Sequence, residues 1–128
     1  MHLVERSTKK AAFLREIVHV TGAPAEVHPV RLEDFVKNLA VPVDVVTARA
    51  LAPLAALLSA TYPLLKTGTL GLFPKGQDVD AELTEAAKCW SIQSSLVPSL
   101  TDPKARLVRI TRIKKISQPG REANRRRR

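Results

Sequence analysis

Short apolar runs alternate with helical stretches along this chain, and the alternation constrains the fold more than any other feature. Residues 44–49 form the clearest strand of the first half, because they are β-branched and do not alternate with polar residues. Such a run is typical of a strand that is covered on both faces. Pro53 suits the first turn of the helix that follows. Its mostly apolar stripe consists of Leu54, Leu57, Leu58, Thr61 and Leu65.

The remaining segments continue the same pattern. Further strands are expected at residues 2–4, 26–30, 69–73, 91–98 and 105–113. Further helices are expected at residues 7–20, 32–38 and 79–89, with a loop at 75–77. The first helix presents Phe13, Leu14, Ile17 and Val18 as its apolar face, and the last presents Val79, Leu83, Ala86, Ala87 and Trp90. This order predicts an α/β fold with a mostly parallel sheet, and the short turn at 101–104 adds a C-terminal antiparallel strand pair.

Length and composition limit the class of protein. The 128 residues suffice for one domain, and 45% of them are hydrophobic. No apolar run is long enough for a membrane span, and no signal peptide is evident, so we expect a cytoplasmic protein with no membrane partner. Cys89 is the only cysteine. No metal constellation stands out, because His2, His19 and His28 are scattered in the sequence, and we expect no metal site.

The net charge of +9 is concentrated at the C-terminus. Residues 1–103 carry 10 Lys and Arg against 11 Asp and Glu, whereas residues 104–128 carry 11 against 1. We expect residues 1–113 to form the folded domain and residues 114–128 to form a basic disordered tail. Such a tail binds a polyanion by releasing counterions, or it is merely solvated, and the sequence alone favours neither function.

Ligands of open α/β sheets bind at the carboxyl ends of the strands, and two charged residues stand there. Glu5 directly follows the first strand. There it either accepts hydrogen bonds from a nucleotide ribose, or faces solvent and interacts favourably with the dipole at the N-terminus of the next helix. Arg49 ends the strand at 44–49, where it either lines the expected crevice or extends along the surface. No glycine-rich phosphate loop and no nucleophile motif accompanies them.

Five segments together resemble one family. They read MHLVERSTKKAAFLREIVHVTGA, HPVRLEDF, DVVTARALAPLAALL, LFPKGQDVDAELTEA and LVPSLTDPKARLVRI. In this order and spacing they are similar to the small-subunit ribosomal RNA guanine-N7 methyltransferases, also called glucose-inhibited division protein B. The resemblance covers roughly residues 2–113.

The resemblance implies a Rossmann-like methyltransferase fold, S-adenosylmethionine as cofactor and small-subunit ribosomal RNA as partner. It places Glu5, Arg6 and Ser7 at the cofactor ribose, Leu32 and Glu33 beside the adenine, and Arg49 beside the cofactor and the target base. Lys75 and Gln77 match a loop on the substrate side. Guanine N7 has no proton to lose, so no catalytic base is expected, and correct approach to the methyl group suffices.

The chain departs from the family at one place. The family's first strand and the Gly-rich loop after it are missing, so we expect a fold truncated at the N-terminus. This chain alone is therefore expected to bind S-adenosylmethionine weakly or not at all. The alternatives are an enzyme present as its C-terminal portion, a non-catalytic RNA-binding remnant, and one half of a split enzyme that needs a separate N-terminal chain.

Overall fold

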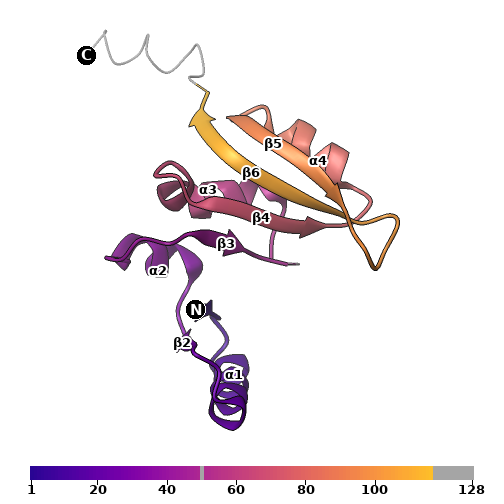
Figure 1. Ribbon diagram of the computed structural model, residues 1–128. Coiled ribbons are helices and arrows are strands. Elements are labelled where there is room, and N and C mark those ends of the chain that lie inside the picture. Colours follow the sequence, from indigo (N-terminus) through magenta and orange to yellow (C-terminus); the bar gives the residue numbers. More distant parts are fainter. Residues whose placement is uncertain (50, 117–128) are drawn as a thin grey trace, which may run out of the picture. The chain divides into compact units, whose positions relative to one another are not determined.

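The computed structural model describes residues 1–49 and 51–116 (Figure 1). These residues alternate between strands and helices, which confirms the expected α/β class. Contacts divide the chain into two compact units, Met1–Pro42 and Val43–Arg128. None of the described helices is long and apolar enough to cross a membrane.

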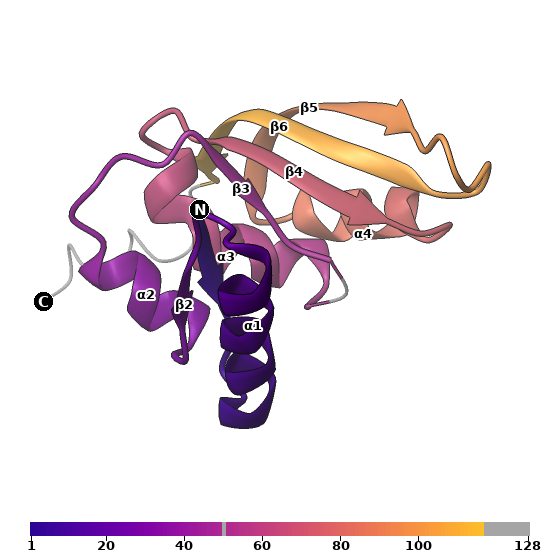
Figure 2. The same cartoon turned by 60° about the horizontal axis from the view of Figure 1, so that its bottom comes forward.

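The first unit is a parallel strand pair with two helices. Strands β1 (His2–Val4) and β2 (Glu26–His28) pair with His2 opposite Glu26 and Val4 opposite His28. Helices α1 (Thr8–Thr21) and α2 (Leu32–Asn38) flank the two strands (Figure 2). Strand β2 ends directly before Pro29, which has no N–H for a ladder hydrogen bond.

The apolar face predicted for α1 is only partly buried. Ala11 is buried and Leu14 and Val18 are half-buried, but Ile17 is exposed and Phe13 is 66% exposed. The prediction is therefore wrong for Phe13 and Ile17. Two three-residue strands offer a surface too narrow to cover the whole apolar arc of a 14-residue helix.

The second unit is a four-stranded sheet with helices on one face. Its strands are β3 (Val45–Thr47), β4 (Leu70–Lys75), β5 (Trp90–Pro98) and β6 (Arg106–Lys115). The order is β3-β4-β6-β5, with β3 parallel to β4 and β6 antiparallel to both β4 and β5. The expected antiparallel pair at the C-terminal end is thus confirmed. Helices α3 (Leu54–Leu65) and α4 (Val79–Ala86) lie against the same face of this sheet (Figure 1).

The core of this unit lies between the sheet and the two helices. All five residues of the stripe predicted for α3 are buried. They meet Phe73 of β4, Val108 and Ile110 of β6, and Trp90, which starts β5. On the face predicted for the last helix, Val79, Ala86 and Trp90 are buried, but Ala87 is exposed because α4 already ends at Ala86.

Two expected strands differ from the structure. Strand β3 is shorter than residues 44–49, and Val45 and Thr47 are exposed, so the predicted burial on both faces is wrong. Among the described strands β3 is one of the two edge strands of its sheet, and both helices of its own unit pack against the same face. Strand β4 includes Lys75, which the sequence placed in a loop.

Strand β6 contains a bulge that reverses its side-chain pattern. Opposite β5, Gln93 pairs with Arg112 and the next residue, Ser94, pairs with Ile110, so Thr111 is the extra residue. Val108, Ile110 and Ile113 are therefore buried, whereas Arg109, Arg112 and Lys114 are exposed on the opposite face. The strand continues two residues past the expected domain end at 113, and residues 117–128 of the predicted tail lie outside the described residues.

Candidate functional site

The candidate ligand site of the first unit lies at the carboxyl ends of β1 and β2. Because the strands are parallel, both chains leave the pair at the same edge. The Glu5 N–H donates to the His28 carbonyl oxygen at 3.0 Å, which holds the two exits together. The segments that follow begin α1 and α2, so two helix N-termini stand at this edge.

The Glu5 carboxylate is fixed at the exit of β1. Its Oε1 accepts a hydrogen bond from the Ser7 N–H at 2.9 Å. Ser7 in turn is the N-cap of α1, and its Oγ accepts from the Lys10 N–H at 3.3 Å. Glu5 and Ser7 are both half-buried, whereas Arg6 between them is exposed. A half-buried acceptor with a fixed orientation suits a ligand that presents hydroxyl donors.

Two further predicted residues open α2 at the same edge. Leu32 is half-buried and Glu33 is exposed, and both belong to the first turn of the helix. Five of the six residues predicted at the cofactor thus lie on the two segments that follow β1 and β2. A carboxylate such as that of Glu5 can accept hydrogen bonds from paired hydroxyl groups, and a leucine side chain can pack against an apolar ring.

Arg49 belongs to the second unit. It lies two residues beyond the end of β3 and its side chain is exposed. Ala50, the next residue, lies outside the described part of the chain. The parallel pairing of β3 with β4 brings the exit of β3 to the edge where Lys75 ends β4.

Lys75 is engaged inside the second unit. Its Nζ lies 2.9 Å from Glu82 Oε1 and donates to the Ala52 carbonyl oxygen at 2.8 Å. The same Glu82 oxygen accepts from the Leu54 N–H at 2.9 Å, at the start of α3. Lys75 thus ties β4 to both helices, a structural role that the sequence did not indicate. Gln77, predicted beside it, is exposed.

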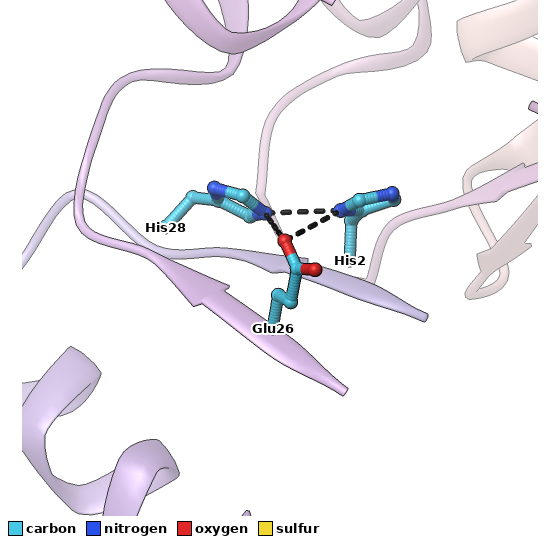
Figure 3. A group of neighbouring side chains, drawn as sticks. All are labelled: His2, Glu26 and His28. Carbon is cyan, nitrogen blue, oxygen red and sulfur yellow. Dashed lines mark hydrogen bonds and ion pairs between the residues drawn. The ribbon is translucent and has the colours of Figure 1, made fainter. Parts of the chain in front are cut away.

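Sequence spacing also missed a cluster of three side chains. His2 and His28, far apart along the chain, lie with their ring nitrogens 3.0 Å apart, and Glu26 reaches both rings (Figure 3). The register of β1 and β2 places all three on one face of the strand pair. A pocket of about 330 Å³ opens beside the two histidines and is lined also by Asp34 and Phe35. Pairing register is not visible in a single sequence, so spacing alone could not reveal the cluster.

The fold and the site define a class. Helices that alternate with parallel strands, an antiparallel strand between β4 and β5, and an acid at the exit of β1 characterise a Rossmann-like methyltransferase fold. A methyltransferase-like protein from Streptococcus mutans, solved in complex with SAH, has this fold. It superposes with a TM-score of 0.57 at 12% identity, over 90% of this chain and 75% of its own.

Sequence comparison identifies the family. The family model described as rRNA small subunit methyltransferase G matches residues 1–108, and the chain belongs to this family. The ribosomal RNA small subunit methyltransferase G of Methylorubrum populi is 48% identical over 116 residues, and that of Methylobacterium radiotolerans is 53% identical over 111. These alignments cover 91% and 87% of this chain but only 54% and 52% of the relatives. The chain therefore spans about half the length of the curated relatives it matches.

Proposed function

We propose that this chain takes part in S-adenosylmethionine-dependent methyl transfer to N7 of a guanine in small-subunit ribosomal RNA, in the cytoplasm. The fixed, half-buried carboxylate of Glu5 at the exit of β1 carries this proposal. The names of the two relatives, each about half identical to this chain, support the ribosomal RNA substrate. The SAH bound by the Streptococcus protein supports the cofactor.

The proposed roles of the individual residues come from the resemblance to the family. In the first unit, the Glu5–Ser7 segment accepts the ribose hydroxyls, and Leu32 and Glu33 border the adenine. For Arg49, the resemblance to the family suggests a role at the methyl donor and the target base. S-adenosylmethionine, when bound, supplies an electrophilic methyl group on a sulfonium. The protein's own contribution is then to orient the partners, because guanine N7 attacks with a lone pair and releases no proton.

Replacement of Glu5 by glutamine tests the ribose contact. The change removes the charge while the side chain keeps its size, and hydrogen bonds to a charged acceptor are stronger than those to a neutral one. We expect the affinity for S-adenosylmethionine to fall about tenfold. The measurement is an NMR titration of the ¹⁵N-labelled chain, which detects even millimolar binding. Amide shifts should concentrate at residues 5–7, 32–33 and 49.

Glu16→Gln provides the matched control, because Glu16 is an exposed acid of α1 away from the strand exits. Its titration should match that of the unmodified chain. Amide shifts confined to other segments, or equal affinities for the two variants, would contradict the proposed cofactor site.

Methyl transfer itself is measured as the radiolabel that passes from S-adenosylmethionine to small-subunit RNA. Activity that appears only after a relative's N-terminal half is added would identify one half of a split enzyme.

The exposed face of β6 favours a second candidate function, RNA binding without catalysis. Six of the eleven basic residues in positions 104–128 lie within the described residues. They are Lys104, Arg106, Arg109, Arg112, Lys114 and Lys115. The bulge at Thr111 keeps Arg109, Arg112 and Lys114 on one exposed face, where they can neutralise neighbouring phosphates. Much of the positive charge of the C-terminal region therefore lies on strand β6.

The double variant Arg109→Gln/Arg112→Gln tests this surface. Loss of two phosphate contacts should lower the salt slope of RNA binding by about 1.5, measured by filter binding between low and physiological salt. Deletion of residues 117–128, which leaves β6 whole, measures the separate contribution of the tail. Arg15→Gln, an exposed arginine of α1, serves as the control. A slope that changes no more in the double variant than in this control would exclude β6 as an RNA-binding face.

A further inference from the structure

Three side chains on the β1–β2 pair point their ligand atoms at one another. His2 Nδ1 lies 3.0 Å from His28 Nε2. Glu26 Oε2 lies 3.9 Å from the first nitrogen and 3.7 Å from the second. Figure 3 shows the two rings facing each other with the carboxylate reaching between them. All three residues belong to the first unit, and none of them is among the residues proposed for cofactor binding.

This triangle has nearly the dimensions of a metal site. Two ligand atoms that each lie about 2.05 Å from a tetrahedral zinc ion are about 3.3 Å apart. The separations of 3.0, 3.7 and 3.9 Å bracket that value, so shifts of a few tenths of an ångström would seat the ion. We propose that His2, Glu26 and His28 bind a divalent transition-metal ion of the zinc class.

The ligand set suits this class of ion. Two imidazoles and one carboxylate are borderline ligands, which zinc and its neighbours bind and which magnesium and calcium do not prefer. Three protein ligands leave a coordination position open for water. The His2 and His28 side chains are 34% and 27% exposed, and Glu26 is 74% exposed, so an ion reaches the site from solvent.

The surrounding structure holds the ligands in place. Phe35 of α2 packs against both imidazoles, with ring centroids 4.6 Å from His28 and 5.5 Å from His2. The parallel register fixes the backbone beneath them. In the absence of metal, one of the two ring nitrogens donates its N–H to the other across the 3.0 Å contact. When a metal ion takes the place of this hydrogen bond, that proton moves to the other nitrogen of the same ring, and the ion joins β1 to β2 through side chains.

The experiment is a zinc titration of the full chain, purified without an affinity tag. Cys89→Ser serves as the background, because this exposed thiol is a second potential zinc ligand. Competition with a chromophoric chelator gives the affinity. We expect one zinc ion per chain, a tetrahedral absorption spectrum with cobalt, and a higher unfolding temperature with metal. His28→Gln and Glu26→Gln should each weaken zinc binding at least about tenfold.

Matched controls lie on α1. His19→Gln and Glu16→Gln make the same chemical changes at exposed positions outside the cluster and should bind zinc as the background does. Far-UV circular dichroism verifies that each variant is folded. If His28→Gln is unfolded, the exposed Glu26 decides the question, because its replacement leaves the packing intact. Absence of zinc binding at 100-fold excess over the chain, or equal loss in variants and controls, overturns the proposal.

Discussion

Replacement of Phe73 by alanine is expected to lower the free energy of unfolding by about 3–5 kcal/mol. The side chain is fully buried in the middle of the core of the second unit. It lies on β4, which pairs with β3 on one side and β6 on the other, and packs beneath α3. Removal of the ring leaves a cavity lined by aliphatic side chains that the sheet prevents from collapsing. Urea denaturation followed by the fluorescence of Trp90, the only tryptophan, measures the change.

Phe13→Ala is the matched control for this prediction. It makes the same chemical change at a side chain that is 66% exposed on α1. The expected loss is below about 1 kcal/mol, because little apolar surface returns to water. Circular dichroism at 222 nm follows both variants, since Trp90 reports on the second unit. A loss at Phe13 as large as that at Phe73 would contradict the exposure of this face of α1.

The second large effect is expected at the ion pair of Lys75 with Glu82. The lysine is 9% exposed and the glutamate 23%, so the pair is well shielded from water. Lys75→Met leaves the Glu82 carboxylate without its cation, although the Leu54 N–H still donates to it. We expect a loss of about 2–3 kcal/mol in the free energy of unfolding, because one charge stays behind unpaired. Chemical denaturation at neutral pH measures it.

Two further variants isolate the charge. The double variant Lys75→Met/Glu82→Gln should be more stable than Lys75→Met alone, because glutamine still accepts from Leu54 and carries no charge. Glu85→Gln makes the same change on the same helix, where Glu85 and Lys88 are both 65% exposed. The hydrogen bond and charge of Glu85 raise the pKa of Lys88, but solvent screens this pair. The Glu85→Gln variant should be as stable as the unmodified chain. An equal loss of stability in Lys75→Met and Glu85→Gln would contradict the larger contribution expected of the Lys75–Glu82 pair.

The sequence predicted elements wherever local chemistry decides them. The stripe on α3 is buried as expected, because its apolar residues recur at the helical period. Ser7 caps the N-terminus of α1 with its side chain, and Gly22, which has a positive φ, caps its C-terminus. The turn before β6 and the antiparallel pairing were also confirmed. The resemblance to the family, based on segments such as TARALAPL, was confirmed over residues 1–108.

Features that depend on tertiary pairing could not be predicted. Whether Phe13 is covered depends on the width of the neighbouring sheet, and whether Lys75 is buried depends on where α4 packs. The approach of His2 to His28 follows from a parallel register that no local pattern specifies. The roles of Glu5, Arg6, Ser7, Leu32, Glu33 and Arg49 at the cofactor remain predictions.

The bulge at Thr111 has a consequence for how this segment can vary among related chains. Beyond the extra residue, every side chain of β6 lies on the face opposite to the one that a regular alternation would give it. A regular strand that kept Thr111 would turn Arg112 and Lys114 toward the core and Ile113 toward water, whereas loss of Thr111 would restore an unbroken alternation with the same faces. Among related chains, loss of this one extra residue is therefore expected to be tolerated, because the buried and exposed side chains of β6 keep their faces.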